Sequence, residues 1–287
     1  MDWENDFVLF EKDVQVSTQS AKLNMAYGGT LIDRANAEQD TFKKKELLTL
    51  AIQHLELAVA LYGDTLLQVD GRDIPVGYAN AYNLLGNAYY TLNQDTAKAE
   101  QAYKMAAYYR PGHFDAFQNL VVIYNDSRRW KESIPYLRAL IDFKPIDGGF
   151  YYKLADAFKN TGEPDSAIKY FNISTEVNPD LNAQNTYQIG LCYGRYKNDL
   201  PKAIEYLNKA SALDPTNLQI KEDLGVAFAM SNQPNNAIPI FRSILSSQPQ
   251  YLNVIYNLSL AYRSLGRIDS AEYYLKVAQS LNPQTQQ

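Results

Sequence analysis

The 287-residue chain is poor in the side chains that most often carry chemistry. Its single cysteine, Cys192, excludes a disulfide within the chain, and its two histidines are His54 and His113. Neither histidine has a second histidine or a cysteine at the spacing of zinc ligands. Glycine-rich phosphate loops of the Gly-x4-Gly-Lys-Ser/Thr and Gly-x-Gly-x2-Gly types are also missing. We therefore expect no metal, no cofactor and no catalysis by this chain.

Two further deficits narrow the class of partner. The chain has 27 Lys and Arg against 32 Asp and Glu, a formal net charge of -5 and a pI near 5.2. A nucleic-acid-binding surface needs a basic excess, so we expect no nucleic-acid partner. No apolar run approaches the roughly 18 residues of a membrane span, and the acidic N-terminus does not have the pattern of a signal peptide. We expect either a cytoplasmic protein or a piece of a longer one.

What the sequence has in abundance is a repeat. Prolines return at intervals of 34, 34, 36, 34 and 34 residues. These prolines are Pro111, Pro145, Pro179, Pro215, Pro249 and Pro283. Before each proline, small, large apolar and aromatic residues recur in one register; Gly86, Tyr89, Ala99 and Tyr103 are the first set. Because spacings of three and four place residues on one face of a helix, each repeat is predicted to be a pair of packed helices.

This register resembles the W-x2-L-G-x2-Y, A-x3-F, P pattern of tetratricopeptide (TPR) repeats. The resemblance covers residues 79–285. The family's tryptophan is replaced by Tyr82, Phe117, Tyr151, Thr186, Lys221 and Ile255. The resemblance implies an all-α fold, a right-handed TPR superhelix (α-solenoid) of about seven helix pairs.

The chain divides into four predicted segments. Residues 1–16 form an N-terminal capping or junction segment, 17–62 a degenerate TPR-like helix pair, 63–78 an inserted loop, and 79–287 six consecutive TPR repeats. In the loop, Asp70-Gly71 signals a hairpin or tight turn, and the loop is either an ordered connection or a lid. The 36-residue interval holds two extra residues, which we place before Gly190 and in the turn 197–200.

The first residues carry a second resemblance. Trp3, Asp6, Leu9 and Phe10, followed by Ser20-Ala21-Lys22, are similar to the junction before the TPR tail of membrane glycosyltransferases related to protein O-mannosyltransferases. This implies a soluble tail on the periplasmic or luminal side, joined to the membrane only through a segment missing from this chain. Alternatively, the segment is an amphipathic cap in which Trp3 and Phe10 pack on the first helix. A free-standing protein would be a cytoplasmic adaptor.

The candidate binding residues follow from the TPR resemblance, in which the first helices of the repeats line a concave groove. Asn and Tyr are frequent at these positions. The predicted peptide-binding residues are Asn83, Asn87, Tyr90, Gln118, Asn119, Asn125, Tyr152, Lys153, Tyr187, Arg195, Tyr256 and Asn257. Asparagine both donates to and accepts from a peptide backbone, and tyrosine gives a large contact at a small entropy cost. We expect a non-catalytic scaffold for a protein or an extended peptide.

Several alternatives stay open for these residues. They could form an ordinary solvated surface. If they line a groove, replacing Asn87 and Asn119 by alanine should weaken partner binding and leave the melting temperature nearly unchanged. With Asn83 and Lys153, the same two asparagines stand where TPR cochaperones hold the carboxylate of a chaperone tail, although the chain offers fewer cations there.

Two expectations concern single residues and the end of the array. Cys192 stands where other repeats have a small apolar residue, so we predict a core cysteine. No capping helix follows Pro283, and Tyr273, Tyr274 and Val277 are candidates for a homodimer through the terminal repeat.

Overall fold

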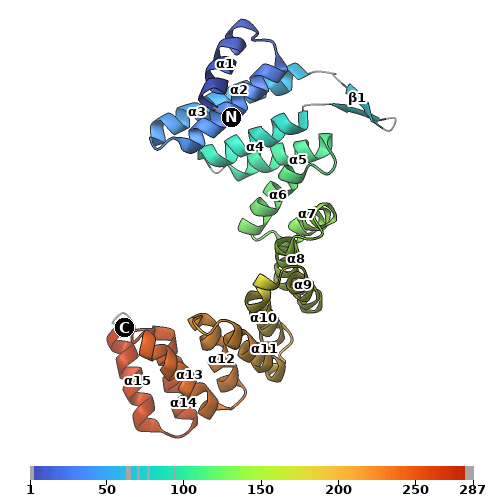
Figure 1. Ribbon diagram of the computed structural model, residues 1–287. Coiled ribbons are helices and arrows are strands. Elements are labelled where there is room, and N and C mark those ends of the chain that lie inside the picture. The colour runs from blue at the N-terminus through green and yellow to red at the C-terminus, as the bar shows by residue number, and fades with distance from the viewer. Residues whose placement is uncertain (1–2, 63–65, 70–71, 76–77, 94, 282–287) are drawn as a thin grey trace. The chain divides into compact units, whose positions relative to one another are not determined.

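The computed structural model describes residues 3–62, 66–69, 72–75, 78–93 and 95–281 (Figure 1). Within these residues the chain is almost entirely helical, which confirms the predicted all-α class. The α-helices are α1 (Trp3–Val16), α2 (Ala21–Ala37), α3 (Thr41–Tyr62), α4 (Tyr78–Asn93), α5 (Thr96–Tyr109), α6 (Phe114–Asp126), α7 (Trp130–Phe143), α8 (Gly148–Asn160), α9 (Pro164–Val177), α10 (Asn182–Leu191), α11 (Leu200–Leu213), α12 (Leu218–Met230), α13 (Pro234–Ser247), α14 (Leu252–Ser264) and α15 (Ile268–Leu281).

The chain forms two compact units, residues 1–143 and 144–287, which we describe separately. The boundary falls inside the segment predicted as six consecutive repeats, after the second of them. From α2 onward, consecutive helices pack in pairs, and the described residues contain seven pairs, from α2 with α3 to α14 with α15. We call the first helix of each pair the A-helix and the second the B-helix.

One antiparallel hairpin interrupts the helices between α3 and α4. Strand β1 (Leu66–Val69) pairs with β2 (Arg72–Pro75), with Val69 opposite Arg72. The hairpin lies in the segment predicted as an inserted loop, on either side of the turn signal at residues 70 and 71, which lie outside the described residues. A lid function for this segment stays a prediction.

Several helix pairs pack closely because the A-helix carries glycine at the crossing point. A Cβ added to Gly86 would lie 2.5 Å from Cε1 of Tyr103, and one added to Gly225 would lie 2.5 Å from Cε1 of Phe241. Both aromatic rings are buried in the core of their unit. Because interiors are packed as densely as crystals, only glycine lets these rings occupy the space between the helices.

The turns from A-helix to B-helix reuse one backbone conformation. A residue just past the A-helix takes a left-handed φ, which ends the helix and turns the chain. These residues are Arg128 (φ 57), Gly162 (φ 82), Asn198 (φ 53), Asn232 (φ 56) and Gly266 (φ 69). Glycine and asparagine tolerate this conformation, whereas arginine is strained there.

Helix α1 covers the first helix pair in the way the capping alternative describes. The Phe7 ring packs on Tyr27 with 5.6 Å between ring centroids, and Cζ of Arg34 lies 4.3 Å from the centroid of the Phe7 ring. Phe10 packs against the same core, while the side chain of Trp3 is outside the described part. Among the residues that the structure describes, none of the helices combines the length and apolar character needed to cross a membrane.

The 36-residue interval is accommodated by two irregular turns. A 3-10 turn, η1 (Pro179–Leu181), leads directly into α10, and Tyr193 follows Pro179 by 14 residues where Phe158 follows Pro145 by 13. The second extra residue widens the end of the helix into a π-turn, η2 (Cys192–Tyr196). This second irregularity therefore begins upstream of the predicted turn at residues 197–200. A helix can absorb one inserted residue when an i→i−4 hydrogen bond is replaced by an i→i−5 hydrogen bond.

Candidate functional site

The predicted groove residues lie on A-helices or in the turns that follow them, and many hydrogen-bond to the next A-helix of the same unit. We call the surface formed by the twelve predicted residues and these partners the A-face. It has one part in each unit.

In the first unit, three asparagines form a connected group. The Asn119 side-chain amide donates to Oδ1 of Asn83 at 3.2 Å and to Oδ1 of Asn87 at 3.1 Å, and the Tyr103 hydroxyl donates to Asn87 Oδ1 at 2.8 Å. Asn83 is only 8% exposed. The premise that Asn87 and Asn119 are free exposed side chains is therefore wrong, because these half-buried amides join α4 to α6, and the effect of alanine on stability stays a prediction.

The other predicted residues of the first unit are less connected. The Tyr90 hydroxyl donates to Oδ2 of Asp126 at 3.3 Å, and burial, with the Asp126 charge, raises the pKa of Tyr90. Gln118 is half-buried, and so is Asn125, whose Oδ1 is buried without a hydrogen-bond partner among the described residues.

His113, dismissed as a metal ligand from the sequence, caps α6 and joins it to α4. Its Nδ1 accepts from the backbone N–H of Ala116 at 3.3 Å, so the proton of the neutral ring sits on Nε2, which donates to Oδ1 of Asn80 at 3.1 Å. Burial, assisted by the charge of Arg110, lowers the pKa of His113. The imidazole is thus held neutral as part of the frame.

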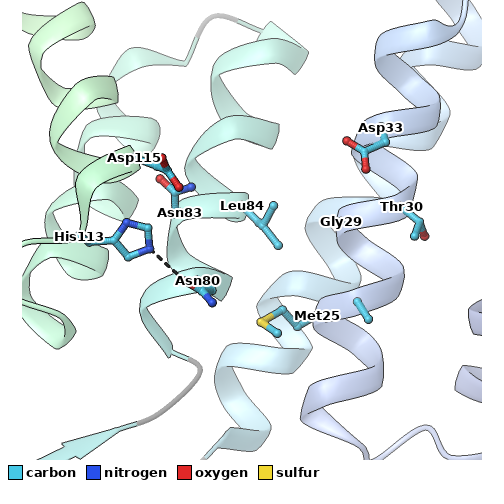
Figure 2. A pocket seen from close by; sticks show the side chains of 10 residues that line it. Met25, Gly29, Thr30, Asp33, Asn80, Asn83, Leu84, His113 and Asp115 are labelled. Atoms are coloured by element: carbon cyan, nitrogen blue, oxygen red, sulfur yellow. Dashed lines mark hydrogen bonds between the residues drawn. The ribbon is translucent and has the colours of Figure 1, made fainter. Parts of the chain in front are cut away.

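Beside this frame lies a hollow of about 440 Å³ between α2, α4 and the start of α6 (Figure 2). Polar groups dominate its lining, with two carboxylates and the two amides of α4, and Met25 and Leu84 supply apolar surface. The lining residues are Met25, Ala26, Gly29, Thr30, Asp33, Asn80, Asn83, Leu84, His113 and Asp115. Its mixed lining suits a polar ligand segment better than an apolar side chain.

In the second unit, Asp223 of α12 is the centre of the A-face. Its Oδ2 accepts from the Tyr187 hydroxyl at 2.6 Å, and its Oδ1 accepts from Nη2 of Arg195 at 3.2 Å. Burial and the hydrogen bond to Asp223 raise the pKa of Tyr187. This bond set joins the predicted residues Tyr187 and Arg195 through an acid that sequence reasoning missed.

The neighbouring acid, Glu222, is buried at 7% exposure and accepts from the Tyr251 hydroxyl at 2.6 Å. This bond, more than burial, raises the pKa of Tyr251 to about 12. Glu222 was also missed, although it occupies the repeat position of Tyr152, Tyr187 and Tyr256 and the shared register could have identified it.

The remaining predicted residues of the second unit have simpler surroundings. Tyr152 packs edge-on against Phe171 at 5.5 Å between ring centroids, and its pKa is raised, chiefly by burial. Lys153 is exposed, and Tyr256 and Asn257 are half-buried. The asparagines of the proposed carboxylate clamp bond to one another in the first unit, whereas Lys153 belongs to the second, so that clamp stays a hypothesis.

A second hollow, of about 370 Å³, opens between α10, η2 and α12. In contrast to the first, most of its surface is carbon. The lining residues are Gly190, Leu191, Gly194, Arg195, Asn198, Leu200, Ala203, Leu207, Asp223, Val226, Ala227 and Met230.

Two further features are the single cysteine and the arrangement of possible metal ligands. Cys192 is fully buried, which confirms a core role, and burial raises the pKa of its thiol to about 11. Among the described residues, no group of three or more His, Cys, Asp and Glu side chains is arranged to hold a metal ion.

Comparison with known proteins adds a family and several relatives. The model of the tetratricopeptide repeat matches residues 149–181, 183–217 and 252–285. The peroxisomal targeting signal receptor of Saccharomyces cerevisiae is 23% identical over 219 residues, which cover 62% of this chain and 36% of the receptor. The corresponding receptor of Eremothecium gossypii is 22% identical over 223 residues, 65% of this chain and 38% of that protein. The chain thus matches little more than a third of the length of these relatives.

Solved structures show the same fold at low identity. YrrB, described as a TPR protein with an unusual peptide-binding site, has a TM-score of 0.58 at 22% identity, covering 74% of this chain and 95% of YrrB. PilW, a type IV pilus biogenesis factor, has a TM-score of 0.57 at 17% identity, with 72% and 94% covered. Three segments of the chain thus match the tetratricopeptide repeat, and the chain shares the all-α fold of these solved structures.

Proposed function

We propose that the chain is a scaffold that binds extended peptide segments of partner proteins along its A-face. The observation that carries this proposal is the combination of fixed polar groups with unfilled hollows on the same helix faces. The hollow beside Asn83 is polar, and the one beside Asp223 is largely apolar. Ligand sites typically pair such a hollow with a few placed hydrogen-bonding groups.

The polar groups are also held before a ligand arrives. Asp223 is bonded to Tyr187 and Arg195, and Asn87 is bonded to Asn119 and Tyr103. Side chains that are already ordered lose less conformational entropy on binding, which favours affinity. In the second unit the A-helices follow one another at one repeat length, so a ligand that spans several of them must be extended.

The relatives agree with this proposal. Two are receptors for a targeting signal, and one solved neighbour is described by its peptide-binding site. Because the chain matches only part of those receptors, the identity of its own ligand is left to experiment.

The test is selection of random displayed peptides on the whole chain. We expect enriched peptides that bind saturably, and a Tyr256→Ala variant that binds them at least about fivefold more weakly, a loss of roughly 1 kcal/mol. Lys276→Ala, at an exposed position of α15, is the matched control and should bind normally. Failure to enrich any peptide, or equal binding by both variants, would contradict the proposal.

The second hypothesis is that this scaffold is the tail of a membrane glycosyltransferase, as the resemblance of residues 3–22 implies. The native protein would then be found in the membrane fraction with a mass well above 32.5 kDa, measured with an antibody raised against this chain. A soluble species near 32.5 kDa would instead support a free-standing cytoplasmic adaptor.

Self-association through the terminal repeat is a further hypothesis. Tyr273 is 62% exposed on α15, beside Tyr274, whose ring stacks on Tyr262. Sedimentation at rising concentration should show a dimer that Tyr273→Glu abolishes. A wild-type chain that stays monomeric at high concentration would refute this hypothesis.

A further inference from the structure

The hollow of the second unit reaches the core. Leu207 and Ala203 of α11 line its floor, although both are almost fully buried. At its mouth stands Met230, which is 64% exposed. An exposed methionine above an unfilled apolar hollow is a combination that folding alone does not require.

One position in the wall of the hollow carries no side chain. At the position four residues after the small crossing residue, the A-helices carry Tyr90, Asn125, Lys159, Ala229 and Arg263, but α10 and its π-turn carry Gly194. A Cβ added to Gly194 would lie 3.3 Å from Cβ of Ala203 on α11, so the absence of a side chain lets the π-turn approach the B-helix closely beside the hollow. Single π-turns inside helices are frequent at functional sites.

The size of the hollow fits a large apolar side chain. An apolar cavity of roughly 150 Å³ already binds benzene. The hollow here measures about 370 Å³ and is open to solvent, which leaves room for an aromatic or long aliphatic group and part of the attached backbone. Removing such a group from water favours binding.

The rim of the hollow carries a charged side chain that can select a polar group on the ligand. Arg195 lies on it, reaches Asp223 through Nη2, and is 62% exposed. A guanidinium has five N–H donors, so the bond to Asp223 leaves donors for a ligand. Asp223 itself already accepts from Tyr187 as well as Arg195. The rim therefore favours an anionic or acceptor group beside the apolar one.

We propose that this hollow is a socket for one large apolar side chain of a bound peptide, with a carboxylate next to that side chain held by Arg195. The socket is defined by Gly194, Leu207, Val226, Met230 and the rim residue Arg195. This inference rests on the proposed peptide-binding function and names the ligand residue that the second unit selects.

The methionines provide a direct test on the whole chain. Of its four methionines, Met230 lines the socket and Met25 lines the polar hollow of the first unit. The probes are N-acetyl-phenylalanine, its amide, and N-acetyl-asparagine, titrated into protein with 13C-methyl methionine. We expect N-acetyl-phenylalanine to shift the Met230 methyl signal saturably, N-acetyl-asparagine to leave it unchanged, and Met25 to respond to neither apolar probe.

Variants separate the two halves of the proposal. Arg195→Gln should abolish the advantage of the acid probe over its amide, and Gly194→Leu should fill the socket and weaken both at least about tenfold. Because Gly194→Leu disturbs packing on Ala203, Met230→Glu provides a second variant whose exposed position spares the fold. Because Met230→Glu lacks the Met230 methyl signal, its binding is measured by saturation-transfer NMR on the probe. The control, Arg263→Glu, changes an exposed charge on α14 and should bind normally.

The results distinguish this inference from the function on which it rests. Equal responses at Met25 and Met230, or full binding by both Gly194→Leu and Met230→Glu, would overturn the socket. Selected peptides that bind without a shared apolar residue would overturn it while leaving the scaffold function intact. If no peptide is selected but N-acetyl-phenylalanine still occupies the socket, the socket stands and the peptide-scaffold function falls.

Discussion

The two units build the same helix pairs but join their A-helices with different chemistry. In the first unit most of the joining groups are neutral, namely the amides of Asn83, Asn87 and Asn119 and the ring of His113, and its phenol–carboxylate bond from Tyr90 to Asp126 is longer, at 3.3 Å. In the second unit two acids of α12 accept hydrogen bonds from tyrosine hydroxyls of neighbouring repeats. Asp223 accepts from Tyr187, and Glu222 accepts from Tyr251. Helix pairs of the same kind can therefore be joined by hydrogen bonds of different chemical types.

The difference has an energetic side. Hydrogen bonds to ionised groups contribute roughly 1.5–3 kcal/mol, against about 0.5–1.5 kcal/mol for neutral pairs. The joining bonds of the second unit should therefore be individually stronger and sensitive to pH. The amide bonds of the first unit should be individually weaker and should respond little to pH.

The largest effect is expected where the units do not differ. Gly86→Leu and Gly225→Leu both force a side chain into an aromatic ring of the B-helix, so each should lower the free energy of unfolding by about 1–3 kcal/mol. Chemical denaturation measures the loss in each variant. Gly149→Ala is the milder control, since its added Cβ meets only a side-chain oxygen of Asp147 at 3.1 Å. A fully stable Gly225→Leu protein would show that the helix register is wrong.

The next effect compares a tyrosine bond to a carboxylate in the second unit with a tyrosine bond to an amide in the first. Tyr251→Phe leaves the carboxylate of Glu222 without its phenol donor, and should cost about 1.5–3 kcal/mol. Tyr103→Phe removes a neutral bond to Asn87 and should cost only about 0.5–1.5 kcal/mol. Both losses are read from denaturant unfolding at neutral pH. Equal costs would remove the proposed distinction between the two units.

Raising the pH should remove the hydrogen bond from the Tyr251 hydroxyl to the Glu222 carboxylate. The pKa of Tyr251 is about 12, above the usual 10.0, so its stabilising contribution is complete below pH 10 and is lost as the pH rises to 12. The free energy of unfolding should fall across that window, and less steeply in Tyr251→Phe than in the wild type. Tyrosine absorbance near 295 nm follows the ionisation during the same titration. Parallel curves for the two proteins would contradict this assignment.

The smallest effect concerns the turns. The first unit has Arg128 with a left-handed φ where the second has Gly162 and Gly266. A left-handed φ costs a residue with a side chain roughly 1–2 kcal/mol. Glycine avoids this strain, but part of the gain is lost because glycine makes the unfolded chain more flexible. Arg128→Gly should therefore stabilise the protein by about 0.5–1 kcal/mol, and Gly162→Arg should destabilise it. Both are measured by thermal unfolding.

The sequence predicts the frame of this molecule better than its contacts. Proline spacing and small residues such as Gly86 and Gly225 predict the helix pairs, because each repeat solves the same packing problem within itself. The bonds between Asn83 and Asn119, and between Tyr187 and Asp223, depend on how one repeat lies on the next, and no pattern within a single repeat contains that information.

The candidate site shows the same limit. The sequence-based choice favoured side chains that can hydrogen-bond to a peptide, chiefly Asn and Tyr. It missed Glu222 and Asp223, which matter because they accept hydrogen bonds from tyrosines of neighbouring repeats. The π-turn was detected as an inserted residue but placed too late, because an insertion that a helix absorbs leaves no turn signal of its own.

The joining bonds also have a consequence for the order in which the protein is assembled. The bonds that link neighbouring A-helices connect residues close in sequence: Asn119 and Asn83 are 36 residues apart, and Tyr251 and Glu222 are 29 apart. Chains dominated by such local contacts fold quickly, because little loop entropy is lost before each contact forms. During synthesis, each bond can close as soon as the next repeat has left the ribosome. The A-face would then be built stepwise from the N-terminus, with each repeat templating the one that follows.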